Sequence, residues 1–202
     1  MTPDQWPARL LVVDVEGNGQ QPPDLVELAA MPVLHGQLAA HSAESTLLRP
    51  PRPITALATG VHHLTNDDVA NAPAWSDIAE KVQADMTGVW FAAHGAHTDY
   101  RLLQRLMPAW EPAGVIDTLR LARAVYPQAP RHGLDALITH VRLNLAAVPG
   151  QRHRAGYDAH VTALLLLEMA GHFTTWDALV AAAVPPGLPG TPPPDFEEST
   201  LW

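Results

Sequence analysis

The sequence predicts an α/β fold, with a mixed β-sheet flanked by α-helices. Strand-like segments come first in the chain and then alternate with helix-like segments, an order typical of layered α/β domains. Hydrophobic residues make up 47% of the 202 positions and charged residues 16%, so the chain can bury a substantial core. This length fits one large domain, or one domain with a tail.

The first predicted strand, residues 10–15, is apolar at nearly every position. Such a run is typical of a strand covered on both faces, so we expect it at the centre of the sheet. Residues 25–34 and 38–48 predict two more strands, which turn at His35-Gly36-Gln37 to give an antiparallel meander. A proline cluster at 49–53 then ends this part of the sheet, because proline lacks a backbone donor.

The remaining elements are predominantly helical. Residues 54–71 have only a short, broken pattern, whereas residues 88–93 and 115–116 are short apolar runs that predict strands. Asp117 stands at the N-cap position of a helix. Apolar side chains at helical spacing predict five helices, which carry Trp75, Ile78 and Val82; Leu102, Leu103 and Leu106; Leu119, Ala122 and Val125; Leu134, Leu137 and Val141; and Val161, Leu165 and Met169. We expect one domain over residues 1–184 and a proline-rich acidic tail over 185–202.

Composition excludes several classes of protein. With 12 basic and 21 acidic side chains the formal charge is −9, so no general field attracts nucleic acid or anionic lipid, and a polyanionic partner must be bound locally. The absence of cysteine excludes disulfides, iron–sulfur clusters and thiolate zinc sites. No apolar run is long enough to span a membrane. We therefore expect a cytoplasmic protein that does not bind membranes; no pattern fixes its oligomeric state.

Four acidic residues are candidates for a common site. Asp14 and Glu16 lie two positions apart at the carboxyl end of the first strand, so both side chains point to one face, where α/β sheets bind ligands. Asp99 precedes Leu102, Leu103 and Leu106 at helical spacing, which puts its carboxylate on the apolar face of a helix. Asp158 repeats this arrangement on a later helix.

Divalent cations would make such a gathering of acids tolerable. An unpaired buried charge costs several kcal/mol, and the helix dipole offsets only about 0.3 to 1 kcal/mol of that cost. A site that combines all four acids therefore needs cations, and oxygen ligands suit Mg²⁺ or Mn²⁺. His153 lies in the segment that leads to Asp158, where a neutral imidazole can accept a proton near pH 7.

Three motifs resemble those of the DnaQ-like DEDDh exonuclease family, which belongs to the ribonuclease H-like superfamily. They are Asp14-Val15-Glu16, His94-Gly95-Ala96-His97-Thr98-Asp99 and His153-Arg154-Ala155-Gly156-Tyr157-Asp158. The similarity extends from about residue 10 to residue 170. Within the family, segments 49–54 and 89–94 most resemble the bacterial exodeoxyribonuclease X branch.

The resemblance implies a ribonuclease H-like fold and a two-metal 3′-to-5′ exonuclease that releases nucleoside 5′-monophosphates from DNA, with single-stranded 3′ ends favoured. Asp14, Glu16, Asp99 and Asp158 would hold two Mg²⁺ or Mn²⁺ ions, with His153 as the general base. Gly17, Val61 and His94 would contact the terminal nucleotide. Four arginines are candidates for local phosphate contacts: Arg131, Arg142, Arg152 and Arg154.

Other functions remain open from the sequence. The same motifs serve exoribonucleases, so RNA or short oligoribonucleotides are alternative substrates. Gly17, Gly95 and Thr98 replace the usual Thr, Asn and Phe of the family; loss of the Phe would weaken base stacking, so a weakly active nucleic-acid-binding accessory module is another alternative. A zinc hydrolase built on His94, His97 and Asp99 is disfavoured because it leaves the first two acids unexplained. In the tail, Phe196 and Trp202 are candidates for binding a protein partner, the alternative being a solvated end.

Overall fold

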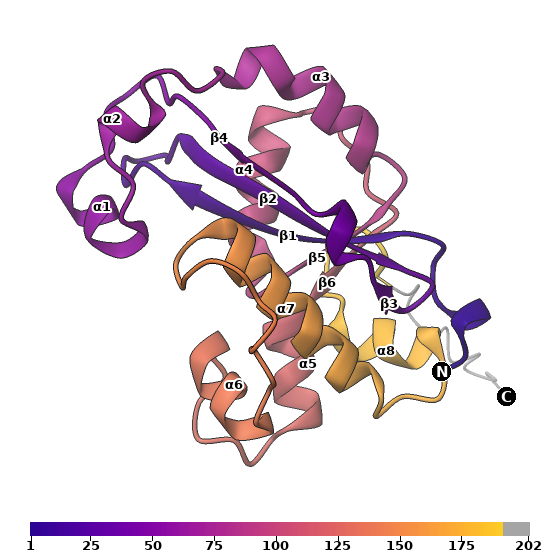
Figure 1. The fold of residues 1–202 in the computed structure, drawn as a ribbon. Coiled ribbons are helices and arrows are strands. Elements are labelled where there is room, and N and C mark those ends of the chain that lie inside the picture. The colour runs from indigo at the N-terminus through magenta and orange to yellow at the C-terminus, as the bar shows by residue number, and fades with distance from the viewer. Residues whose placement is uncertain (192–202) are drawn as a thin grey trace, which may run out of the picture.

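A computed structural model describes residues 1–191, which form a mixed six-stranded sheet with helices on both faces (Figure 1). The strand order is β3-β2-β1-β5-β6, and β4 also pairs with β2. The strands are β1 (Leu10–Gly17), β2 (Leu25–Leu34), β3 (Gln37–Leu38), β4 (Glu44–Leu47), β5 (Trp90–Ala93) and β6 (Gly114–Asp117). The predicted central position of the first strand is confirmed.

The strand β1 organises both halves of the sheet. It is antiparallel to β2, with Glu16 opposite Glu27, and parallel to β5, which in turn is parallel to β6. Leu10 and Val12 face one hydrophobic cluster, and Leu11 and Val13 face the other. Because both faces of β1 are covered, its sequence is apolar at successive positions instead of alternating.

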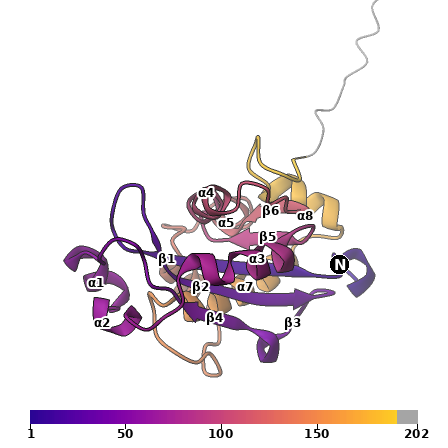
Figure 2. The same cartoon turned by 90° about the horizontal axis from the view of Figure 1, so that it is seen from above.

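Helices cover the two faces unequally (Figures 1 and 2). The cluster on one face includes side chains of α5, α6, α7 and α8, and the cluster on the other includes side chains of α3 and α4. The α-helices are α1 (Ala56–His62), α2 (Asn66–Val69), α3 (Trp75–Met86), α4 (His97–Leu106), α5 (Thr118–Val125), α6 (Leu134–Val141), α7 (Ala155–Ala170) and α8 (Trp176–Ala183); η1 (Pro3–Gln5) and η2 (Ala40–Ser42) are 3₁₀ turns. Within the described residues, no helix is long and apolar enough to cross a membrane.

The predicted strand at 38–48 is wrong as one continuous element. The 3₁₀ turn η2 divides it into β3 and β4, and both pair with β2. The Ala39 amide donates to the Pro32 carbonyl, and the Ser42 amide donates back to Ala39, which closes the turn. The residues between Ala39 and Leu47 are small or polar, so no apolar alternation holds them to the sheet.

Several helices lie where the sequence pattern was short or overlooked. The broken segment 54–71 forms α1 and α2, which begin after Thr55 and Thr65; each threonine side chain accepts a backbone N–H of the first turn. The helix α8 was not predicted, although Thr175 caps it in the same way. These caps satisfy donors that a short helix otherwise leaves unpaired.

The first residues of the proposed tail lie against the sheet. The Val115 amide of β6 donates to the Pro189 carbonyl over 2.9 Å, and Leu188 packs against the adjacent hydrophobic cluster. Residues 185–191 contain neither a helix nor a strand. The predicted docking side chains Phe196 and Trp202 lie outside the described residues.

Candidate active site

An acidic cluster lies at the carboxyl end of β1. Asp14 and Glu16 of β1 and Asp158 of α7 each offer a carboxylate oxygen, and these oxygens all lie within 4.8 Å of one another. The two β1 side chains share a face because they are two positions apart. The helix α7 packs against β1 and β2 (Figure 1). Its first turn thereby carries Asp158 to the two β1 acids. Among residues 1–191, this is the one group of three or more side chains placed to hold a metal ion.

Asp99 adjoins this cluster from the first turn of α4. Its carboxylate is buried, and the backbone amides of Asp99 itself and of Val15, which lies between the two β1 acids, partly offset the rise in its pKa that burial causes. Among neighbouring charges, Asp99 is the largest cause of the raised pKa of Asp14. The structure therefore brings all four predicted acids to one place, with Asp99 just outside the tightest group.

The cluster is short of positive charge. Burial, followed by repulsion from neighbouring carboxylates, raises the pKa of Asp14 well above its usual value and that of Glu16 to about 8. Burial also raises the pKa of Asp99 to about 7 and raises that of Asp158. Carboxylate oxygens this close together, without enough protein cations to balance them, have the chemistry of a divalent-cation site. The residues therefore fit Mg²⁺ or Mn²⁺.

His153 stands beside Asp158 in the segment before α7. Its backbone amide donates to Asp158 Oδ2 over 3.1 Å, while its ring is exposed. Arg152 Nη2 donates to His153 Nε2 over 3.3 Å and also pairs with Asp135 of α6. The imidazole is thus next to the acidic cluster, at the edge of a cleft of about 410 Å³. The cleft is lined by Asp14, His94, Arg131, Gly133, Leu134, Asp135, Ala136, Arg152, His153 and Asp158.

His94 lines this cleft with both ring nitrogens already bonded. Nδ1 lies 3.0 Å from Thr118 Oγ1, and Nε2 donates to the His132 carbonyl over 3.0 Å. Burial lowers the pKa of His94, which favours the neutral form of the ring. The uncommitted parts of the ring are its carbon atoms and its face.

Gly17 and Val61 lie outside the lining of this cleft. Gly17 ends β1 at an irregularity of the β1–β2 ladder, and its carbonyl accepts from His62 Nε2 over 3.3 Å. Val61, the neighbour of His62 on α1, is 45% exposed. Leu57, one turn earlier on the same helix, is 81% exposed and was overlooked in the sequence; its spacing of four from Val61 was the available signal.

Two of the four candidate arginines, Arg131 and Arg152, line the cleft. Arg154 instead forms an ion pair with Glu27 of β2, and Arg142 caps the end of α6. Glu27 is another residue that the sequence reasoning missed, although a single acid in the apolar run of β2 was a visible anomaly.

The predicted cap Asp117 is confirmed, and it also orders the second motif. Its carboxylate Oδ1 accepts from the amides of Leu119 and Arg120 at the start of α5. The same oxygen accepts from the Gly95 amide over 3.0 Å. Asp117 therefore ties α5 to the turn that leads into α4 and Asp99.

Comparison with known proteins gives consistent matches. The exonuclease family model RNase T matches residues 11–166. Exodeoxyribonuclease 10 of Escherichia coli (strain K12) is 33% identical over 161 residues, which are 79% of this chain and 68% of that protein. The 3′-5′ exonuclease DinG of Bacillus subtilis (strain 168) is 30% identical over 171 residues, 80% of this chain but 17% of that protein. A solved structure of Exonuclease X in complex with 5′ overhanging duplex DNA has a TM-score of 0.70 and 32% identity, covering 82% of this chain and 95% of that one.

A mixed sheet with helices on both faces and acids gathered at the end of its central strand defines the class of ribonuclease H-like exonucleases. Within this class, the chain belongs to the DnaQ-like DEDDh family of 3′–5′ exonucleases, enzymes that hydrolyse nucleic acids. The family, fold and enzyme class predicted from the three motifs are confirmed.

Proposed function

We propose that this protein removes nucleoside 5′-monophosphates from the 3′ ends of DNA, with single-stranded ends favoured, in a reaction that needs divalent metal ions. The observation that carries the proposal is the meeting of Asp14, Glu16 and Asp158 within 4.8 Å. The names of the similar proteins, an exodeoxyribonuclease and an exonuclease bound to duplex DNA, support DNA as the substrate. The cytoplasmic location expected from the sequence is part of the same proposal.

The acids would hold two Mg²⁺ or Mn²⁺ ions. Asp14, Glu16 and Asp158 offer the closest oxygens, and Asp99 adds a fourth carboxylate beside them. Their raised pKa values mean that the folded chain disfavours bare negative charge here, so bound cations relieve repulsion that folding creates. When bound, two such ions activate a water molecule and stabilise the leaving oxygen of an in-line displacement.

His153 would act as the general base. As the water oxygen bonds to phosphorus and the bond from phosphorus to the 3′ oxygen breaks, the imidazole takes the water proton. Its ring is exposed at the edge of the cleft, and the hydrogen bond from its backbone amide to Asp158 holds the residue beside the acids. Arg131 and Arg152, which line the cleft, would bind phosphate oxygens and supply the local positive charge that a net charge of −9 requires.

The terminal nucleotide would lie between the cleft and α1. His94 would contact it through the ring face or carbon edge, because both of its nitrogens are bonded elsewhere. Val61 offers an exposed apolar side chain, and Gly17 offers backbone without a side chain at the end of β1. A Cβ on Gly17 would lie 3.1 Å from Pro23 Cβ, so this position favours a small residue.

The test compares 3′-labelled single-stranded DNA, duplex DNA and RNA, each with Mg²⁺, with Mn²⁺ and with chelator. We expect mononucleotide release from single-stranded DNA that stops when the metal is removed. Faster release from RNA would replace DNA by RNA as the substrate. Binding without release by folded protein would leave a nucleic-acid-binding accessory module and overturn the proposed function.

A further inference from the structure

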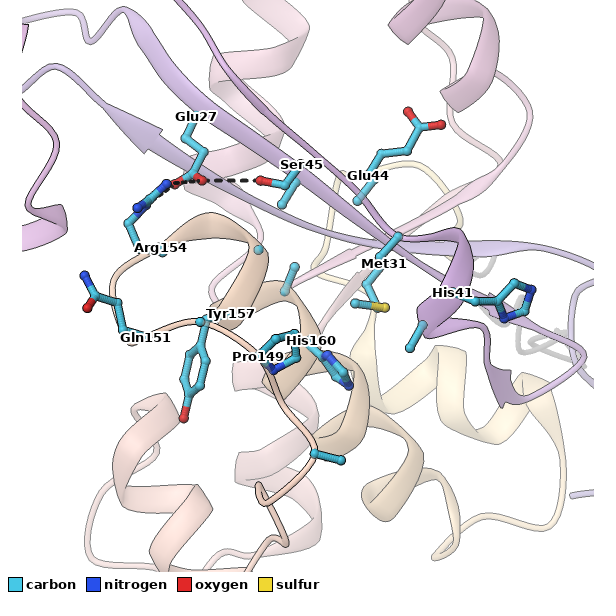
Figure 3. Close-up of a pocket in the computed structure, with 18 residues that line it drawn as sticks. Glu27, Met31, His41, Glu44, Ser45, Pro149, Gln151, Arg154, Tyr157 and His160 are labelled. Carbon is cyan, nitrogen blue, oxygen red and sulfur yellow. Dashed lines mark hydrogen bonds and ion pairs between the residues drawn. The ribbon is translucent and has the colours of Figure 1, made fainter. Parts of the chain in front are cut away.

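Glu27 is a buried acid that the proposed chemistry does not use. Its side chain is 4% exposed, yet its two oxygens accept four hydrogen bonds. Arg154 donates through Nε and Nη2, each over 2.9 Å, the Ala155 amide donates over 3.0 Å and Ser45 Oγ donates over 3.3 Å. Figure 3 shows Glu27, Arg154 and Ser45 together, where α7 begins beneath β2 and β4.

These bonds fasten the beginning of α7. Arg154 is the N-cap residue of the helix, but its own side chain makes no capping bond. Glu27 of β2 provides the missing cap, because its carboxylate accepts a hydrogen bond from the amide of Ala155, the first helical residue. A carboxylate at a helix N-terminus also interacts favourably with the helix dipole.

The fastened segment carries two of the proposed functional residues. The Asp158 amide donates to the Arg154 carbonyl over 3.0 Å, and the His153 amide donates to Asp158 Oδ2. One turn of helix thus joins the Glu27 contact to Asp158, and His153 precedes that contact directly. A movement of Arg154 relative to β2 would therefore displace both His153 and Asp158.

The register of the β1–β2 ladder fixes where Glu27 lies relative to the two β1 acids. Glu27 of β2 lies directly opposite Glu16 of β1 in the antiparallel ladder. In the first turns of α7 the side chains packed into the adjoining core are small, Ala155 and Ala159, whereas the large ones, such as Leu165, come later in the helix. The bidentate pair to Arg154 adds the directional contact.

We propose that Glu27 is a positioning residue, which holds His153 and Asp158 at the distance from Asp14 and Glu16 that the reaction needs. This inference rests on the proposed function and gives Arg154 a partner other than substrate phosphate. Its physical basis is that a displacement of about 1 Å in a catalytic group can cost about 10²-fold in rate.

The first test is Glu27→Gln, compared with Glu44→Gln as a matched control. Glu44 is a carboxylate on the neighbouring strand β4 that pairs with Lys81 at the surface. For Glu27→Gln, we expect kcat to fall by about 10²-fold with KM within about threefold, because the residue positions catalytic groups. We also expect Mn²⁺ affinity, measured from the free-ion electron paramagnetic resonance signal, to fall by about tenfold, as it does when an outer partner of a metal ligand is lost. The control should match the wild type.

A double variant separates positioning from stability. In Glu27→Leu/Arg154→Met, an apolar pair replaces the ion pair, a change that often leaves folding stability nearly unaltered. Positioning predicts a folded protein, destabilised only by the loss of the Glu27 acceptor for Ala155 and Ser45, with kcat and Mn²⁺ affinity still low, and Glu27→Asp should retain part of both. Folded Glu27 variants with wild-type kcat and Mn²⁺ affinity would overturn the inference. Wild-type protein that releases no nucleotide would overturn the proposed function instead, and the Mn²⁺ titration would still decide the role of Glu27.

Discussion

Glu16 and Glu27 face each other across the β1–β2 ladder, but their surroundings are opposite. Glu27 is neutralised by Arg154 and accepts two further hydrogen bonds. Glu16 shares its site with Asp14 and Asp158, and burial, followed by the negative charges of Asp158, Glu27 and Asp99, raises its pKa to about 8. Burial of an acid therefore does not by itself mark a reactive site. The balance of charge around the acid distinguishes a fastening residue from a candidate metal ligand.

Asp117, like Glu27, is a buried acid whose carboxylate is hydrogen-bonded. It accepts three backbone amides, from Gly95, Leu119 and Arg120, and so fastens the turn that leads to Asp99. The two fastened acids hold the two helices that bring Asp99 and Asp158 to β1. Glu27 and Asp117, whose carboxylates are hydrogen-bonded, thus hold together the acidic cluster, whose negative charges are not balanced. We therefore expect the neutralisation of an acid to have opposite effects in the two groups.

The largest expected effect is that of Asp14→Asn on activity. Loss of a metal-site carboxylate removes several kcal/mol of transition-state stabilisation, and each ~1.36 kcal/mol is tenfold in rate, so we expect a loss of about 10³-fold or more. In metal-free protein at pH 8 the same variant should unfold at a higher temperature than the wild type, because it removes a charge whose pKa is raised by burial and repulsion. Nucleotide release and thermal unfolding measure the two effects.

The control for this variant is Asp85→Asn, which removes an exposed carboxylate that pairs with Lys81. It should leave both rate and unfolding temperature near the wild-type values, since exposed pairs contribute little. An Asp14→Asn protein with wild-type turnover would place the chemistry elsewhere.

His153→Ala should lower kcat by about 10²- to 10⁴-fold, the usual contribution of a general base. Mn²⁺ affinity should stay within about threefold, because the bond to Asp158 comes from the His153 backbone amide, which the substitution retains. Single-turnover cleavage and Mn²⁺ titration separate the two quantities. His140→Ala, on α6, is the control. Equal loss of metal binding and rate would make His153 a support for the acids instead of a base.

Metal-free stability should fall as pH rises. Glu16, whose usual pKa is 4.5, reaches about 8 in the folded chain, so the folded state holds more protons than the unfolded state between these values. The slope of the unfolding free energy with pH is therefore negative in this window. His62 and His94, whose pKa values burial lowers, act in the opposite direction below about pH 6.5.

The measurement is the unfolding temperature from pH 5 to pH 9, for wild type and Asp14→Asn, with chelator and with Mg²⁺. The histidines contribute equally to both proteins, so their contribution cancels in the difference between the two curves. We expect the unfolding temperature of Asp14→Asn to fall less steeply with pH than that of the wild type. Mg²⁺ should stabilise the wild type more at pH 8 than at pH 5, where it competes with protons. A wild-type curve that rises through pH 8 without metal would contradict the charge imbalance at the cluster.

The sequence could predict those parts of the fold and of the site that depend on local patterns. Asp14 and Glu16 were recognisable because a strand period of two places them on one face, and the motifs around Asp99 and Asp158 resemble a known family. The partner of Glu27 is 127 residues away, so no local pattern could identify it. The division of 38–48 was also invisible, because it depends on a bond from Ala39 to Pro32 that forms only when the sheet does.

The smallest expected effect concerns the terminal nucleotide. Val61 is exposed and next to His62, which bonds to the end of β1, so its side chain is available to the substrate. Val61→Ala removes two methyl groups, but only about half of the Val61 surface is left for the nucleotide to bury, so the expected loss is about one methylene, or ~0.8 kcal/mol, which corresponds to a rise in KM of about fourfold with kcat unchanged. Val82→Ala on α3, where the side chain packs away from the acidic cluster, is the control and should leave KM unaltered. A loss confined to kcat would mean that Val61 acts on the reacting groups, as Asp14 does, and not on binding.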